Sequence, residues 1–421
     1  MLDRTIPPKS KEIEDIDFPW PEFYALRNQI PLYVLNGGSQ PIIELELVFR
    51  SGSYYETYPG TAYFTSAMLL EGTKHKSTQD IANIMDYYGA TIGTRSQADF
   101  CVVSLSTLYK HLSPMLDLLV EILLESNFPQ KSLKLLKELK AQTIQVANKK
   151  NRKVAYKQFF ESLFTTEHPY GRHLTLKNVV DIQIDYLDDY YKNTFFCDCS
   201  AFASGQITPA ALQRIQQFLE QLPQQKRYQD NKKVHYKHPA NKVHLTNGQR
   251  LQSAIVIGKP LMIKKDPDFL PMIVVNELLG GYFGSRLMRN IREEKGYSYG
   301  IYSSINALQE AGYLGIATEV AQNVTQETIQ EIYKEIETLQ HELVGEEELQ
   351  KVKNYLLGSF LKTINDPFSI MQKFQAAYLH GLDKSYYNAF YNQVRNITPL
   401  EIRNLARKYL SLSTLTEIVV S

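Results

Sequence analysis

Three short patterns in this chain combine residue types that bind ligands or metals in other proteins. The glycine-rich run at 280–285 lacks the G-x-x-x-x-G-K-[ST] layout of a phosphate-binding loop and does not follow a strand. A His-x-x-His pair at 235–238 lies in a lysine-rich stretch, where a solvated loop is a better interpretation than a metal site. Cys197 and Cys199 lack the C-x-x-C spacing, and Cys101 makes the cysteine count odd, which favours buried, inert thiols over a disulfide framework or a metal site. None of these patterns assigns chemistry to the chain.

The stretch at 60–73, GTAYFTSAMLLEGT, has the clearest local organisation. A Pro-Gly pair at 59–60 makes a turn. Ala62 and Met68 favour a helix, and Gly72 can end it. We therefore expect a helix that runs directly out of a turn.

This helix resembles the first helix of the pitrilysin/insulinase family of zinc metallopeptidases, which includes the mitochondrial processing peptidase. In active members the helix carries His-x-x-Glu-His, in which both His bind zinc and the Glu activates water. The corresponding positions here hold Tyr63 for the first His, Ser66 for the Glu and Ala67 for the second His. The third ligand of active members, a downstream Glu, corresponds to Thr143.

The resemblance therefore implies a chain without a zinc site. Ala67 offers no donor atom, and neutral Ser and Thr hydroxyls are poor zinc ligands. Without zinc and the glutamate, neither a Lewis acid nor a base activates water. We expect no cofactor and no catalytic residue in this chain, with zinc only in a partner subunit. A residual peptidase with an unfamiliar metal site is the weakest alternative.

The resemblance covers nearly the whole chain. Its motifs lie at 60–73, 89–90, 168–172 (HPYGR), 189–191 (DYY), 252–254 (QSA), 279–287 (LGGYFGSRL) and 291–299 (IREEKGYSY). The family's fold is α+β, with two similar domains that each pack helices on a mostly antiparallel β-sheet, and we expect this fold here.

Residue patterns point to the same organisation. Apolar residues alternate with charged ones at 42–50, as in a strand with one wet face. Strand-like and helix-like segments recur at 251–258 and 267–280, so that LLEG at 69–72 and LLGG at 278–281 come into register. This recurrence, near 209 residues, suggests an internal duplication. Strands and helices do not alternate throughout, which favours α+β over a doubly wound sheet.

The chain of 421 residues is long enough for two domains. A polar, basic stretch at 223–246 is the expected linker, which places one peptidase-like domain at 1–222 and a second at 247–421. Residues 1–30 are expected to form an extended lead-in. Further strands are expected at 90–97, 100–107, 195–205, 297–304, 312–319 and 414–420. Further helices are expected at 77–89, 112–126, 130–165, 183–192, 324–343, 346–362, 367–380 and 397–410.

Composition excludes several classes of partner. The net charge of +1 provides no general attraction to nucleic acid or to an acidic membrane surface. No run of 18 apolar residues occurs, so we expect no membrane span. The N-terminus has no apolar core typical of a secretory signal, which favours a cytoplasmic protein. A periplasmic location would require that a signal had been removed.

The second half keeps a pair of residues that the family uses. In the family, the C-terminal domain supplies an Arg and a Tyr that help to hold substrate at the zinc, and Arg292 and Tyr299 match them in an Arg-x-x-x-Gly-x-x-Tyr arrangement. Arg offers fixed donors for peptide carbonyls, and a phenol hydroxyl can stabilise an oxyanion. The structural alternative is that Arg292 pairs with Glu293 or Glu294 at a helix end and that Tyr299 packs in a sheet.

The resemblance thus favours a non-catalytic subunit of a heterodimeric zinc metallopeptidase. A homologous subunit with the zinc motif would be the partner, the two chains would enclose a peptide substrate, and Arg292 and Tyr299 would bind that peptide. The alternative is a catalytically inactive peptide-binding or structural homologue that works without a peptidase partner. Retention of both residues favours the first hypothesis, because a scaffold does not need them.

Overall fold

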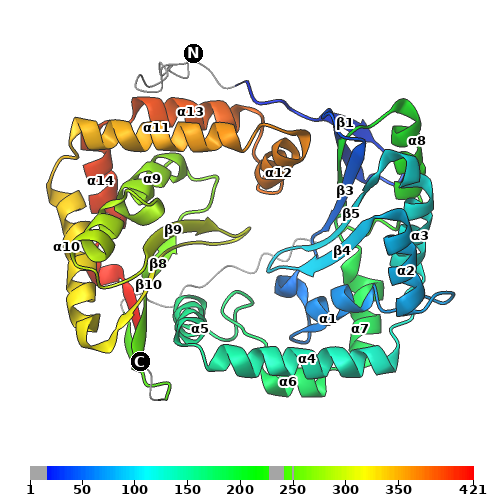
Figure 1. Ribbon diagram of the computed structural model, residues 1–421, viewed down its shortest axis with the longest axis horizontal. Helices are drawn as coiled ribbons and strands as arrows, with labels where there is room; N and C mark the ends of the chain where they lie inside the picture. The colour runs from blue at the N-terminus through cyan, green and yellow to red at the C-terminus, as the bar shows by residue number, and fades with distance from the viewer. Residues whose placement is uncertain (1–16, 227–240, 249–250) are drawn as a thin grey trace, which may run out of the picture.

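Each half of the chain forms one β-sheet with helices on its outer side, and the two sheets face each other across the molecule (Figure 1). The structure, a computed structural model, describes residues 17–226, 241–248 and 251–421. Only one neighbouring pair of strands in each sheet is parallel, and the others are antiparallel. The arrangement confirms the prediction of an α+β fold with two similar domains.

The first sheet has six strands in the order β1-β2-β6-β3-β5-β4. Alternation in β3 buries Ile43, Leu45 and Leu47 against the helices, as the period of two predicted. Its strands are β1 (Glu22–Ala25), β2 (Pro31–Asn36), β3 (Ile42–Phe49), β4 (Thr91–Ser96), β5 (Cys101–Leu108) and β6 (Ser200–Gly205).

The second sheet repeats the first except for its edge strand β1. Its order is β7-β11-β8-β10-β9, which corresponds to β2-β6-β3-β5-β4, and β7–β11 is parallel as β2–β6 is. Its strands are β7 (Lys242–Leu245), β8 (Gln252–Leu261), β9 (Ile301–Ala307), β10 (Gly312–Ala321) and β11 (Thr416–Val420). Strand β7 overlaps the predicted linker at 223–246, and residues 227–240, with the His-x-x-His pair, lie outside the described residues. The domain boundaries remain a prediction.

Local signals in the sequence account for several helices. Helix α2 begins with a capping box between Ser77 and Asp80 and ends at Gly89, whose φ is 58°. The first half has α1 (Thr61–Met68), α2 (Thr78–Tyr88), α3 (Leu112–Leu124), α4 (Gln130–Asn148), α5 (Asn151–Phe164), α6 (Leu176–Asp181), α7 (Ile184–Tyr190) and α8 (Pro209–Leu219). The second has α9 (Phe269–Asn276), α10 (Thr325–His341), α11 (Glu346–Lys362), α12 (Pro367–Tyr378), α13 (Ser385–Asn396) and α14 (Pro399–Tyr409).

The two halves exchange a helix. Helix α5 of the first half packs on β8 and β11 of the second sheet, whereas α12 of the second half packs on β6 and β2 of the first (Figure 1). Phe159 of α5 joins a buried cluster with Val256 and Ile418. Phe374 of α12 joins another with Val48 and Phe202. Each sheet is therefore covered on its inner side by a helix from the other half.

Several expected elements differ from the structure. The lead-in contains β1, and neither β2, α8 nor α13 was expected. The expected helix at 130–165 is two helices, because the backbone at Lys150 is extended and redirects α5 toward the other sheet. The expected strand at 195–205 begins only at Ser200, so Cys197 and Cys199 precede it instead of sharing one of its faces. As expected, the three cysteines are buried and free. No helix among the described residues has the length and apolarity to cross a membrane.

Candidate functional site

Helix α1 leaves its turn at a residue that must be glycine. Gly60 has a φ of 100°, and a Cβ there would lie 2.8 Å from Leu174 Cδ1. Glu56 accepts a hydrogen bond from the backbone N–H of Ala62 at 3.1 Å, which satisfies one of the free donors at the helix start. The guanidinium of Arg172 lies 3.7 Å from the same carboxylate, so the HPYGR segment at 168–172 is tied to the beginning of α1.

The positions that correspond to the zinc ligands do not form a metal site. Ser66 is buried and donates to Cys101 Sγ at 3.4 Å, and Ala67 has no donor atom. The exposed Thr143 donates its hydroxyl to the backbone oxygen of Leu139 at 2.9 Å on its own helix. Tyr63 therefore remains the only one of the four that borders the adjacent pocket. Zinc does not fit this donor set. The described residues contain no group of three or more His, Cys, Asp or Glu side chains that could hold a metal ion.

A lysine of the chain lies beside the first of these positions. The ammonium of Lys140 on α4 is 3.6 Å from the centroid of the Tyr63 ring on α1, a cation–π contact. Burial lowers the pKa of Lys140 and raises the pKa of Tyr63. Sequence reasoning missed Lys140, although it precedes Thr143 by three residues, one helical turn.

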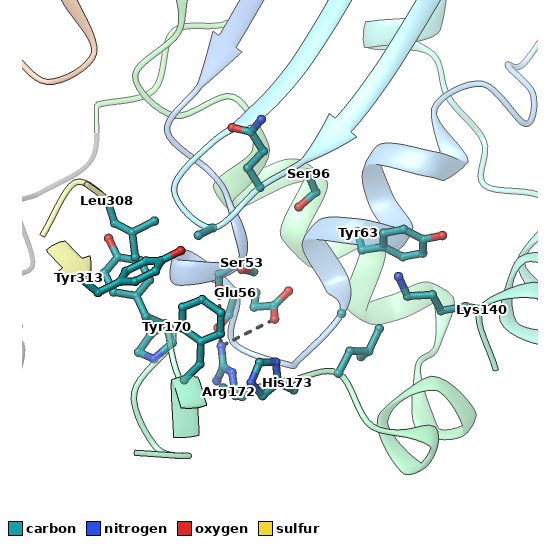
Figure 2. A pocket seen from close by; sticks show the side chains of 16 residues that line it. Ser53, Glu56, Tyr63, Ser96, Lys140, Tyr170, Arg172, His173, Leu308 and Tyr313 are labelled. Carbon is teal, nitrogen blue, oxygen red and sulfur yellow. Dashed lines mark hydrogen bonds and ion pairs between the residues drawn. The ribbon is translucent and has the colours of Figure 1, made fainter. Parts of the chain in front are cut away.

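The adjacent pocket, with a volume of about 390 Å³, lies between the two halves. Figure 2 shows Tyr63 and Lys140 on one side and Leu308 and Tyr313 of the second half on the other. Burial raises the pKa of Glu56 to about 7, against the opposing effects of two backbone N–H groups and Arg172.

Two further groups border this pocket. Burial lowers the pKa of His173, whose Nε2 lies 3.2 Å from the backbone oxygen of Lys157. Arg172 donates to the backbone oxygen of Ser53 at 3.3 Å. These contacts hold the loop and helix ends in place, and no described arrangement in the pocket resembles a base with a nucleophile.

Arg292 and Tyr299 lie elsewhere in the second half. Arg292 belongs to a π-helical segment, Met288–Glu294, and its guanidinium lies over the Phe283 ring at 4.5 Å from the centroid. Among the described ion pairs, none joins Arg292 to Glu293 or Glu294. Tyr299 is 94% exposed and therefore does not pack in the sheet.

The structure does not bring the two residues into mutual contact. Tyr299 borders a shallow pocket of about 370 Å³ together with Arg152 and Tyr302, whereas Arg292 does not line it. No hydrogen bond or ring contact between Arg292 and Tyr299 occurs among the described residues. Neither borders the pocket next to α1.

Comparison with known proteins identifies the family in both halves. Residues 35–176 match the family model described as insulinase, peptidase family M16, and residues 181–356 match the one described as peptidase M16 inactive domain. The protein named uncharacterized zinc protease YmxG of Bacillus subtilis is 21% identical over 83% of this chain and 86% of its own length. The protein named non-peptidase homolog YmxG of Helicobacter pylori is 22% identical over 93% of this chain and 92% of its own length.

Solved structures show the same fold. A peptidase M16 inactive domain from Pseudomonas fluorescens superimposes with a TM-score of 0.86 at 22% identity, covering 95% of this chain and 98% of that one. A protease from Helicobacter pylori gives a TM-score of 0.86 at 15% identity, covering 96% of this chain and all of that one. With the two family models in sequence and the fold in common, this chain belongs to the pitrilysin/insulinase family, peptidase family M16, as a homologue without the zinc motif.

Proposed function

We propose that this chain is a non-catalytic subunit of a two-chain zinc metallopeptidase of its family. A homologous partner subunit would carry the zinc motif, and Arg292 and Tyr299 of this chain would bind the peptide that the two subunits enclose. The observation that carries the proposal is the contrast between the two sites. The positions of the zinc ligands hold no usable donors, whereas Tyr299 is 94% exposed.

The chemistry of the two side chains supports a peptide-binding role. The Arg292 guanidinium lies over the Phe283 ring and carries five N–H donors, from which peptide carbonyls can accept hydrogen bonds. The exposed Tyr299 hydroxyl could donate to an oxyanion that forms at a partner's zinc. Named relatives include both a zinc protease and a non-peptidase homolog, the two kinds of chain that such a complex needs.

A second candidate is a catalytically inactive peptide-binding or structural homologue that works alone. The helix exchange favours it, because α5 and α12 already cover the inner sides of both sheets without a second chain. Solution mass measurements of the chain with and without a zinc-motif homologue distinguish the two candidates.

Co-expression with a zinc-motif homologue from the same source tests the proposal. Peptide hydrolysis is measured for each chain alone and for the mixture, and we expect activity in the mixture above that of either chain. Tyr299→Phe removes one hydroxyl and Arg292→Lys removes the planar fork, so each should slow the complex while the melting temperature of the isolated chain is retained. Full turnover in both variants would end the case for this pair.

Metal analysis tests the predicted absence of zinc. After dialysis against micromolar zinc, we expect no stoichiometric metal in the purified chain. Tyr63→His, Ser66→Glu and Ala67→His together should not create activity, because Thr143 still lacks a carboxylate. Hydrolysis by this triple variant alone would show that the third ligand lies elsewhere.

A further inference from the structure

A second pocket between the halves has an unusual distribution of charge. Its volume is about 760 Å³, within the range typical of small-molecule sites. In this pocket, the guanidinium of Arg50 from the first half is 3.2 Å from the carboxylate of Glu310 from the second half and interacts with Asp198. Lys264 and Lys265, in the connection between β8 and α9, line the same pocket. The first cluster combines one cation with two carboxylates, whereas the second carries only positive charge.

The lysine cluster extends beyond the pocket wall. His380, which follows α12, lines the pocket beside the two lysines, and Lys373 of α12 lies close enough to Lys264 to lower its pKa. No ion pair between Lys264, Lys265 or Lys373 and a carboxylate occurs in the described part of the chain. The described polar contact of Lys264 is a hydrogen bond from Nζ to the backbone oxygen of Ala376 at 3.3 Å.

A purely structural role does not account for this cluster. Ala376 lies in the last turn of α12, where the helix dipole provides about half of one negative charge. That charge can balance one ammonium in part, but the cluster holds three lysines. Burial and Lys373 together lower the pKa of Lys264, and burial lowers the pKa of Lys373. Among the described residues, the fold thus holds neighbouring lysines, two of them desolvated, without an ion pair to a carboxylate.

We propose that this pocket is a binding site for a small multivalent anion that carries phosphate or carboxylate groups. Lys264 and Lys265 contact its charged groups, and His380 adds a third donor. A bound anion offsets both the mutual repulsion of the cations and their loss of hydration. Because Arg50 of the first half lines the same pocket, a ligand that spans the pocket also contacts both halves. The proposal is independent of the peptidase partner.

His380 should make anion binding at this site depend on pH. Burial and the charges of Lys264 and Lys265 lower the pKa of His380 to about 4, so the ring is neutral at pH 6 in the free protein. Its Nδ1 lies 3.5 Å from the amide of Gln309, and Arg50, Glu310 and Asp198 are the other charged groups of the pocket.

An anion beside His380 favours the charged imidazolium, so binding takes up a proton and strengthens as pH falls toward the His380 pKa of about 4 in the free protein. His380→Gln removes this proton uptake and should leave only the pH dependence that arises from titration of the anion itself.

Calorimetric titration with pyrophosphate and with citrate, at constant ionic strength in chloride, tests the site. We expect at least one of the two to bind, and the arm that binds assigns phosphate or carboxylate recognition. Lys264→Gln with Lys265→Gln should weaken binding about tenfold or more, equivalent to about 1.4 kcal/mol. The matched control, Lys110→Gln with Lys177→Gln, removes the same charge from exposed positions and should bind as the wild type does.

The melting temperature without anion separates this proposal from a structural role. Removal of repelling cations should leave the melting temperature of the Lys264/Lys265 variant unchanged or raised. A lowered melting temperature with unchanged anion affinity would overturn the proposal, as would the absence of binding in both arms. Equal weakening in the matched control would also overturn it, because the effect would then reflect net charge alone.

Discussion

The two halves have the same strand order but differ in the helix that follows the central strand. In the first half, α1 ends at Met68 and the chain turns at Gly72, whose φ is 149°. In the second half, α9 continues into a π-helical segment, Glu277–Gly281, and a further one follows at Met288–Glu294. The duplicated sheets fix the core, whereas the ends of these helices are free to differ. Tyr63 lies within α1 of the first half, and Arg292 lies in the second π-helical segment of the second half.

Unlike the ends of α1 and α9, the helix exchange is similar in the two halves. Helix α5 follows α3 and α4, and α12 follows α10 and α11, so each half contributes the third helix of its series to the other sheet. The halves therefore stabilise each other through two similar junctions. The predictions below test whether the junctions and the buried groups of the halves are equivalent.

Phe374→Ala and Phe159→Ala should have the largest effect. Both side chains are fully buried, at 0% exposure, and their loss leaves a cavity at one junction each, which costs about 3–5 kcal/mol. Urea unfolding followed by circular dichroism measures this loss of stability. Fluorescence of Trp20, whose ring centroid lies 4.7 Å from that of Phe374, reports on the junction between α12 and the first sheet. The exposed Tyr87→Ala should change stability by less than about 0.5 kcal/mol. A large loss in only one of the two would show that the junctions are not equivalent.

Tyr170→Phe should weaken a polar contact between the halves. The Tyr170 hydroxyl donates to Asp99 Oδ1 at 2.5 Å and accepts the backbone N–H of Glu310 at 3.3 Å. Asp99 also accepts the N–H of Gln309 at 3.2 Å, so the β9–β10 turn of the second half is held by the first. Loss of the hydroxyl leaves buried groups unsatisfied and should cost about 1–3 kcal/mol in urea unfolding. Tyr109→Phe at an exposed position is the control, and an equal loss there would contradict the assignment.

Each half also holds one buried glutamate whose pKa burial raises to about 7. For Glu56 in the first half, hydrogen bonds from backbone N–H groups and the charge of Arg172 oppose the rise in pKa. For Glu277 in the second half, burial alone raises the pKa. Both pKa values lie above the ordinary value for glutamate, near 4.5. The protonated carboxyl groups therefore stabilise the folded state fully below about pH 4.5, and this stabilisation is lost as pH rises through about 7. Stability should fall between these limits by about 3 kcal/mol for Glu56, and by less for Glu277, which is only partly buried.

The variants Glu56→Gln and Glu277→Gln measure this pH dependence in the two halves. Each should flatten the profile of unfolding free energy against pH between pH 5 and 8, and the double variant should flatten it most. Profiles parallel to that of the wild type would contradict the role of both carboxyl groups.

The smallest effect concerns the two cation–aromatic contacts. Lys140→Met removes the contact with Tyr63 and should cost less than about 1 kcal/mol, because the side chain is only half-buried. Arg292→Met removes the corresponding contact with Phe283 in the second half and should have a similarly small effect on stability. If the proposed function holds, only the second variant lowers turnover of a complex. Thermal unfolding and turnover, measured on both variants, separate the roles of the two halves.

Some features of this protein follow from local sequence alone. Ser77, Asp80 and Gly89 determine where α2 begins and ends, because capping bonds and the left-handed turn involve neighbouring residues. The absence of zinc donors at Ser66 and Ala67 is likewise decided by residue type, since no fold can supply the missing ligand atoms.

Other features depend on contacts between distant residues. Helices α4 and α5 read as one amphipathic stretch, and only the position of the second sheet separates them at Lys150. Lys140 meets Tyr63, and Lys264 meets the end of α12, across 77 and about 112 residues of sequence, respectively. Such pairings produce no periodic pattern or capping motif in the local sequence, because they form only when packing brings whole elements together. The tertiary structure therefore decided the pockets and their charges, whereas residue types had already decided which zinc-ligand atoms the motif positions lack.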